Sequence, residues 1–125
     1  DIVPALEACA SPDGSASLAG LSLDWHPDMA MTVVMAANGY PGSYEKGSVI
    51  EGLDKVSAAT VFHAGTTRAE DGSLRAIGGR VLNVTALGKT VAQAQANAYA
   101  GVDRIEWPQG FCRRDIGHKE IAREG

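Results

Sequence analysis

One segment of the sequence carries a full set of helix signals and constrains the fold more than any other feature. Thr90 and Gln93 form a capping box, in which a hydroxyl and an amide satisfy N–H groups that the first helical turn leaves free. An apolar stripe at spacings of three and four follows, which predicts one buried helix face. The stripe consists of Val91, Ala94, Ala98, Val102 and Ile105. We therefore expect a helix from Thr90 to Trp107, ended by Pro108 and Gly110.

Several apolar or β-branched runs that are bounded by turn residues predict strands. Met29–Ala37 is a compact apolar run that stops at the turn residues 38–42, so we expect a buried strand there. Asp71-Gly72 is the strongest hairpin signal in the chain, and it separates residues 60–68 from Leu74–Ala86. Shorter strands are expected at Ser48–Ile50 and Thr60–His63.

The order of these elements indicates the fold class. Residues 1–10 have the apolar spacing of a helix, whereas residues 11–24 form a loop by composition. Residues 80–85 read as a strand of mixed burial, in which Arg80, Leu82 and Val84 alternate with Val81, Asn83 and Thr85. Residues 111–117 form a short extended piece that runs into a polar tail. We therefore expect an α+β fold, with a mostly antiparallel sheet and flanking helices.

Length and composition exclude several classes of protein. A chain of 125 residues and 13.0 kDa corresponds to one domain with its own core. Its net charge of −4 and pI of about 5.2 argue against a nucleic-acid partner. Neither a membrane-spanning run nor a signal peptide is seen, so we expect a cytoplasmic protein without a membrane partner. Cys9 and Cys112 lie far apart, which favours free thiols and leaves one long-range disulfide open.

The sequence matches several catalytic motifs only in part. Gly88-Lys89-Thr90 stands between a strand and a helix, but a phosphate-binding P-loop needs a glycine where Asn83 stands. Residues 43–46 have the S-x-x-K spacing of penicillin-recognising serine enzymes, but lack the companion motifs. His26, His63 and His118 are scattered, and the acidic residues show no paired spacing. We therefore predict neither a catalytic residue nor a metal ligand.

The Arg113-Arg114-Asp115 segment has two interpretations. Two adjacent arginines on an extended chain point to different sides. One of them can pair with Asp115 or another carboxylate while the other faces outward, where its planar guanidinium suits a phosphate. The alternative is a surface ion pair that binds no ligand.

Four blocks of sequence resemble, in their order and spacing, the phosphoribosylamine–glycine ligase family, also called the glycinamide ribonucleotide synthetases. They read GYPGSYEKG, VFHAGT, GRVLNVTALGKT and FCRRDIG, at residues 39–47, 61–66, 79–90 and 111–117. The resemblance is to the C-terminal part of that family, which belongs to the ATP-grasp superfamily. It covers nearly the whole chain and is weakest over residues 11–28.

The resemblance implies a fold like the C-terminal domain of ATP-grasp purine enzymes. Residues 1–28 would be a leading helix and linker, and residues 29–125 the domain itself. The family joins glycine to phosphoribosylamine in purine biosynthesis, splitting ATP through a glycyl phosphate, and a metal ion offsets the phosphate charge. ATP and Mg²⁺ or Mn²⁺ would be bound by parts preceding Asp1, so we expect no cofactor in this chain and no ligase activity from it alone.

The same resemblance implies that the domain closes one side of the substrate cleft. Arg113 and Arg114 would contact the phosphate of phosphoribosylamine or glycinamide ribonucleotide, and Lys46 is a weaker candidate. The expected protein partner is the rest of the ligase chain. Two other functions stay open: a non-enzymatic module that docks on its parent chain or a partner, and an independent small enzyme. An exposed apolar patch favours the former, and a deep pocket with convergent titratable groups the latter.

Overall fold

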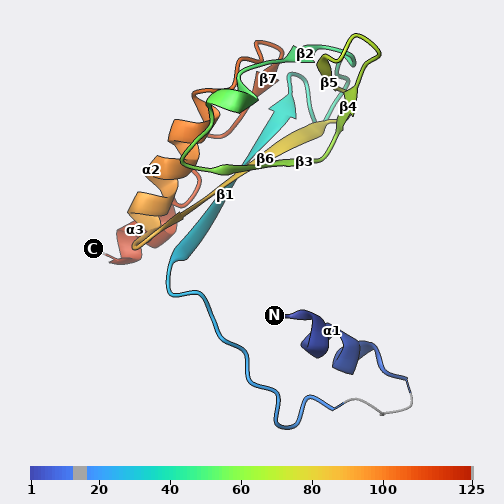
Figure 1. Ribbon diagram of the computed structural model, residues 1–125. Helices are drawn as coiled ribbons and strands as arrows, with labels where there is room; N and C mark the ends of the chain where they lie inside the picture. Colours follow the sequence, from blue (N-terminus) through green and yellow to red (C-terminus); the bar gives the residue numbers. More distant parts are fainter. Residues whose placement is uncertain (13–16, 125) are drawn as a thin grey trace.

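The computed structural model describes residues 1–12 and 17–124 and has the predicted α+β class (Figure 1). Residues 13–16, which belong to the predicted loop 11–24, and Gly125 lie outside the described residues. Every strand pairing in the described part is antiparallel, so the predicted class is confirmed. The elements are α1 (Val3–Ala10), β1 (Met29–Ala37), β2 (Val49–Ile50), the 3₁₀ helix Leu53–Lys55, β3 (Thr60–His63), β4 (Thr66–Arg68), β5 (Leu74–Ala76), β6 (Arg80–Gly88), α2 (Val91–Val102), β7 (Gly110–Phe111) and α3 (His118–Glu124).

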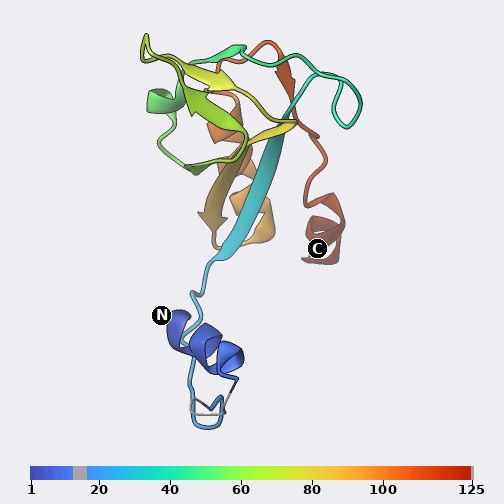
Figure 2. The ribbon, with the colours of Figure 1, turned by 90° about the vertical axis from the view of Figure 1, so that its right-hand side faces the viewer.

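A four-stranded sheet in the order β3-β6-β1-β7 forms the body of the domain. Val33 on β1 lies opposite Val84 on β6, and both side chains are 0% exposed. Helix α2 runs along one face of these two strands (Figure 2) and buries Ala94 and Ala98 there. The core therefore lies between this face and α2. It includes Val33, Met35, Val81, Leu82, Val84, Ala86, Ala98, Val102, Ile105 and Trp107.

The predicted hairpin at Asp71-Gly72 is confirmed, but its two arms belong to two sheets. β4 and β5 pair around this turn and form a three-stranded sheet with β2, whereas β3 and β6 pair within the first sheet. Each arm is interrupted at the point where the backbones of Gly65 and Gly78 are in contact. They lie so close together that a Cβ on Gly65 would be 2.6 Å from the Gly78 Cα. Each predicted arm therefore divides into two shorter strands.

Helix α2 begins where the sequence predicts, and it ends earlier. The Gln93 N–H donates to the Thr90 hydroxyl oxygen at 3.1 Å, and the Lys89 N–H donates to the Gln93 side-chain oxygen at 2.8 Å. The first bond is the one that a capping box predicts, whereas the Gln93 side chain accepts from the N–H of Lys89 and not from that of Thr90. The helix ends at Val102, so the predicted end at Trp107 is wrong.

The residues after α2 form turns and a β-bridge in place of a further helical turn, and Ile105 and Trp107 among them are buried in the core. The N–H groups of Arg104 and Ile105 donate to carbonyls three residues back, at 3.2 and 3.0 Å, which tightens the chain into turns. Glu106 then forms an isolated β-bridge with Glu51. Ile105 and Trp107 are 8% and 5% exposed, so Ile105 is buried as expected although it lies outside the helix.

The chain closes with helix α3 where the sequence predicts a polar tail. Both carboxylate oxygens of Glu124 accept the Val91 N–H at 3.1 Å, so α3 caps the N-terminus of α2. A helix of only seven residues gains most of its stability from such contacts, which a local sequence pattern does not display. Of the predicted extended piece at residues 111–117, only Phe111 lies in a strand, the two-residue β7.

Helix α1 confirms the predicted helix within residues 1–10 and lies apart from both sheets (Figures 1 and 2). None of its eight residues is buried, and the apolar side chains Ile2, Val3 and Leu6 are 55%, 50% and 57% exposed. Cys9 and Cys112 are free thiols, as the sequence favours. In the described part of the chain, no helix has the length and apolar content that a membrane crossing requires.

Candidate functional site

The face of the first sheet opposite α2, which we call the open face, carries polar side chains from β1 and β6. Thr32 and Thr85 are paired across these strands, with their hydroxyl oxygens 2.8 Å apart. Val34 lies opposite Asn83 two residues further along, and therefore on the same face. The open face is the sheet surface that this domain can offer to a ligand.

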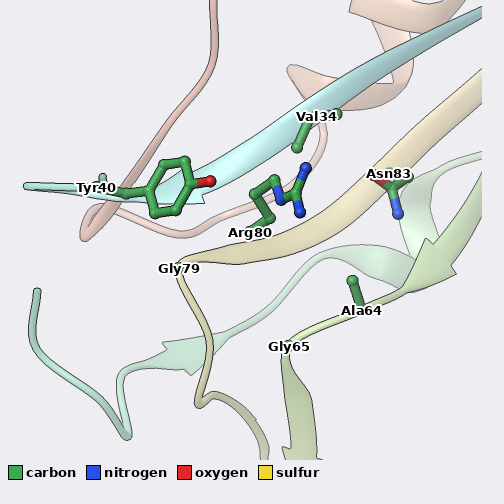
Figure 3. A pocket seen from close by; sticks show the side chains of 7 residues that line it. All are labelled: Val34, Tyr40, Ala64, Gly65, Gly79, Arg80 and Asn83. Carbon is green, nitrogen blue, oxygen red and sulfur yellow. The ribbon is translucent and has the colours of Figure 1, made fainter. Parts of the chain in front are cut away.

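Two adjoining hollows lie on the open face and share Val34, Tyr40 and Arg80. The first hollow measures about 650 Å³ and is also lined by Ala64, Gly65, Gly79 and Asn83 (Figure 3). The second hollow measures about 470 Å³ and is also lined by Arg113 and by apolar side chains that include Phe111 and Ile116. These volumes fall in the range of small-molecule sites. No aspartate or glutamate of residues 17–124 lines either hollow.

Arg80 reaches the open face because of an irregularity in the ladder between β1 and β6. Met35 pairs with Leu82, but the next residue, Ala36, pairs with Arg80, so Val81 is an extra residue on β6. Such a β-bulge redirects side chains relative to simple alternation. The sequence alternation put Arg80 on the face of Leu82, and this was wrong: Leu82 is 0% exposed in the core, whereas Arg80 lines both hollows.

The Arg80 guanidinium is free of protein partners. Its side chain is exposed, and within residues 1–12 and 17–124 it forms no hydrogen bond or ion pair. Tyr40 packs against the Gly79 backbone, where a Cβ would lie 2.8 Å from the Tyr40 Cε2. Figure 3 shows the Tyr40 hydroxyl directed toward the Arg80 side chain, whose guanidinium points away from Tyr40 on the side of Val34 and Asn83. An unpaired guanidinium in hollows without carboxylates is suited to bind an anion.

Arg113 lines the second hollow and is held by Asp115. Its Nε and Nη2 donate to the two Asp115 carboxylate oxygens at 2.9 and 2.6 Å, in a bidentate pair. The predicted pairing of one arginine with Asp115 is confirmed. The pair leaves the Arg113 side chain 67% exposed, so its remaining N–H groups are accessible to a ligand.

Arg114 points to another side of the domain than Arg113, as predicted, although it lies at a bend and not in a strand. Its Nη1 lies 2.7 Å from an Asp103 carboxylate oxygen, and its guanidinium lies 5.4 Å from the centre of the Tyr99 ring. Arg114 lines a different hollow, beside Val102 and Trp107. It faces outward with 60% of its side chain exposed, and it is paired as well.

Tyr99 on α2 organises the segment that carries both arginines. Its hydroxyl donates to the Arg113 carbonyl oxygen at 2.8 Å and accepts the Ile116 N–H at 3.0 Å. The same ring lies beneath Arg114. No local pattern in the sequence marks Tyr99, because its contacts join the helix to residues that follow it by more than a dozen positions.

Lys46, the third predicted phosphate contact, lies away from these hollows. It is exposed in the loop between β1 and β2 and lines neither hollow of the open face. Among the predicted contacts, only Arg113 lines a hollow together with Arg80. Across residues 1–12 and 17–124, no group of three or more His, Cys, Asp or Glu side chains could hold a metal ion.

The Arg113–Asp115 pair leads us to predict how the titration of Asp115 and the stability of the pair depend on pH. The Arg113 guanidinium holds the pKa of the Asp115 carboxyl below its ordinary value of 3.8. A lowered pKa in the folded state means that the pair's stabilisation is present above the unfolded-state pKa, about 3.9, and is lost as the pH falls through the folded-state value. NMR titration of the Asp115 carboxyl carbon should give a midpoint below 3.8, and Arg113→Gln should raise that midpoint toward the ordinary value.

Asp71 provides the internal control for this titration. Hydrogen bonds from the Ser73 hydroxyl and N–H hold the pKa of Asp71 at about 2, and neither donor is near the substituted residue in sequence. The Asp71 midpoint should therefore stay constant in Arg113→Gln. An Asp115 midpoint that does not move on this substitution would contradict the assigned ion pair.

Comparisons with known proteins agree on one family. A family model described as "Phosphoribosylglycinamide synthetase, C domain" matches residues 30–119. The chain is 56% identical over 117 residues to the phosphoribosylamine–glycine ligase of Mesorhizobium japonicum. The matched segment covers 92% of this chain and 27% of that protein. It is 51% identical over 111 residues to the chloroplastic phosphoribosylamine–glycine ligase of Arabidopsis thaliana, covering 86% of this chain and 21% of the relative.

A solved structure is similar as well. The crystal structure of phosphoribosylamine–glycine ligase from Thermotoga maritima matches with a TM-score of 0.62 and 36% sequence identity, over 69% of this chain and 21% of that chain. The chain therefore spans about a quarter of the length of the relatives that it matches.

Proposed function

Since the chain belongs to the phosphoribosylglycinamide synthetase C-domain family, we propose that it works as the C-terminal domain of a phosphoribosylamine–glycine ligase. Residues 1–28 then serve as the leading helix and linker, and residues 29–125 as the domain. The observation that carries the proposal is 56% identity over 92% of the chain to a protein of that name. The location expected for such a ligase in bacteria is the cytoplasm, and the Arabidopsis thaliana relative is named as chloroplastic.

In this proposal, the domain supplies one wall of the substrate cleft. ATP-dependent ligation activates a carboxylate as an acyl phosphate so that an amine can attack it, and the remainder of the ligase would bind ATP and Mg²⁺ or Mn²⁺ for that step. The open face contributes binding and orientation, because its hollows carry guanidinium groups and no carboxylate.

Arg113 is the best supported contact to the substrate phosphate. It lines a hollow without carboxylates, and Asp115 fixes its orientation while leaving other N–H groups accessible. Arg114 and Lys46 stay predictions, since Arg114 lines a different hollow and Lys46 lies in an exposed loop. The phosphate in question is that of phosphoribosylamine or of the product, glycinamide ribonucleotide.

A docking role is compatible with the same proposal. Val34 and Phe111 line the hollows and are 38% and 42% exposed, and Phe62 on the neighbouring β3 is 53% exposed. The apolar side chains of α1 are exposed too. Apolar surface of this kind favours contact with another protein surface, and the partner that fits the family is the rest of a ligase chain.

The proposed function can be tested by exchanging domains. The matching segment of the Mesorhizobium japonicum ligase would be replaced by this chain, and ATP-dependent ligation of glycine to phosphoribosylamine would be measured. We expect the chimaera to retain activity within about tenfold of the parent, because 56% identity preserves most buried contacts. We expect no ligation by the chain alone. A chimaera that folds like the parent and is inactive would overturn the proposed function.

Arg113→Gln in this chimaera tests the phosphate contact. Loss of a charge-assisted hydrogen bond should raise the KM for phosphoribosylamine about tenfold or more, with a smaller change in the KM for ATP. Arg123→Gln is the matched control, because Arg123 is 77% exposed and also pairs with a carboxylate, that of Glu120, at 2.9 Å. An unchanged KM for phosphoribosylamine in Arg113→Gln would contradict the role of Arg113.

A further inference from the structure

We propose that Tyr99 is a positioning residue, which holds the bend at residues 113–116 open and thereby fixes where the Arg113 guanidinium points. The identity of the ligand, the phosphate of phosphoribosylamine, rests on the proposed function. In a closed four-residue turn, the first carbonyl oxygen accepts the fourth N–H directly. Here the Tyr99 hydroxyl lies between these two groups, donating to the Arg113 carbonyl oxygen at 2.8 Å and accepting the Ile116 N–H at 3.0 Å.

Gln95 holds the same bend from one helical turn earlier on α2. Its Nε2 donates to the Ile116 carbonyl oxygen at 2.6 Å. Residues four positions apart lie on the same face of a helix, so Gln95 and Tyr99 both reach the bend from one face of α2. Both side chains are half-buried. The backbone of the bend is therefore attached to α2 by two side chains that hydrogen-bond to it.

The chain beyond the bend is held in place as well. Gly117 has a φ of +84°, and a Cβ there would overlap the Met31 side chain on β1 and lie 3.7 Å from the Gln95 Nε2. Further along, the Glu124 carboxylate accepts the Val91 N–H at the start of α2. The bend thus stands between two fixed elements, β7 and α3, and the hydroxyl decides the path of the residues between them.

The direction of Arg113 depends on this path because its partner belongs to the same bend. The bidentate pair with Asp115, at 2.9 and 2.6 Å, requires that the two residues keep their relative position, which the backbone of the bend sets. The Arg113 side chain is 67% exposed, so packing alone does not fix it. Without the Tyr99 hydroxyl, the Arg113 carbonyl and the Ile116 N–H would be free to bond each other, which would close the bend and move the guanidinium.

The test is Tyr99→Phe in the Mesorhizobium japonicum chimaera, because this substitution removes the hydroxyl and keeps the ring beside Arg114. We expect the KM for phosphoribosylamine to rise about threefold to tenfold, while the KM for ATP stays within about twofold of its value in the unsubstituted chimaera. Gln95→Ala should change the KM for phosphoribosylamine in the same direction, since it removes the second attachment of the bend.

Asn97→Ala is the matched control for these substitutions. Asn97 lies on the same helix, and its Nδ2 donates to the Leu87 carbonyl oxygen at 2.8 Å. Its substitution, like Gln95→Ala, removes one bond from a side chain of α2 to a neighbouring backbone, but that bond ends on β6. The midpoint of urea unfolding should therefore fall to a similar extent in both variants, whereas only Gln95→Ala should raise the KM for phosphoribosylamine.

A double variant separates positioning from a role in stability alone. If Tyr99 acts through Arg113, adding Tyr99→Phe to Arg113→Gln should change the KM for phosphoribosylamine by less than about twofold. Two effects that multiply in the double variant would overturn the proposed role of Tyr99. An unchanged KM in a Tyr99→Phe chimaera that folds like its parent would overturn it as well.

NMR of the 125-residue chain keeps the role of Tyr99 separate from the proposed function. Tyr99→Phe should raise the titration midpoint of Asp115, because the pair with Arg113 is weakened, and should leave that of Asp71 constant. The dispersion of the amide spectrum checks the fold. An inactive chimaera would remove the proposed function, and the Asp115 midpoint would then decide: a rise retains the positioning role of Tyr99, and no change overturns it.

Discussion

Replacing Trp107 with alanine is expected to lower the free energy of unfolding by about 4 kcal/mol, as for other buried tryptophans. Trp107 is 5% exposed, and its indole Nε1 donates to the Ser48 hydroxyl oxygen at 2.9 Å. Its ring lies so close to Gly110 that a Cβ there would be 2.5 Å from the Trp107 Cδ2. The substitution removes this packing and leaves a cavity between the core and the start of β7, close to the segment that carries Arg113.

Urea unfolding followed by circular dichroism measures this effect. The matched control is Trp25→Ala, because Trp25 is the other tryptophan of the chain and is 81% exposed. An exposed side chain contributes little, so the control should change stability by less than about 0.5 kcal/mol. A loss of under about 1 kcal/mol for Trp107→Ala would mean that this tryptophan does not occupy the core as described.

The second large effect is expected for Gly88→Ala, at about 3 kcal/mol. A Cβ on Gly88 would lie 2.8 Å from the Gln93 carbonyl carbon and 2.9 Å from the Ala94 Cα. These atoms belong to the backbone of α2, which cannot shift without separating the helix from β6. Gly88 belongs to the Gly88-Lys89-Thr90 motif, so the glycine serves the close contact between strand and helix.

Gly72→Ala separates this steric effect from the conformational preference of glycine. Gly72 has a φ of +82° and no atom within 4 Å of an added Cβ, so its substitution should cost only about 1 kcal/mol. Both variants would be compared by urea unfolding under the same conditions. If Gly88→Ala costs no more than Gly72→Ala, the close contact between β6 and α2 is wrong.

The elements that the sequence predicts best are those whose signals are local. Met29–Ala37 and Thr60–His63 have the predicted bounds, because apolar runs that stop at turn residues determine where a strand can form. The Thr90 cap is correct for the same reason, since its hydrogen bonds span only a few residues. The family resemblance likewise depends on ordered blocks of residues, and the matching family model supports it.

The candidate site was predicted only in part. Arg113 and Arg114 line different hollows, and the pairing of Arg113 with Asp115 is confirmed. Arg113, and not Arg114, lines a hollow together with Arg80. This depends on how residues 111–117 pass the edge of the sheet, which the spacing of residues within that segment does not predict. Arg80 was missed because strand alternation assumes a regular ladder.

The sequence by itself determined the class of the fold, the start of α2, the principal strands and the family, because these depend on patterns that neighbouring residues carry. Only the tertiary structure decided where α2 ends, how the Asp71-Gly72 arms divide between two sheets, and which side chains reach the open face. The physical reason is that these features depend on contacts between distant segments. The bulge at Val81 moves Arg80 from the expected face to the hollows, and it exists only in the register between β1 and β6.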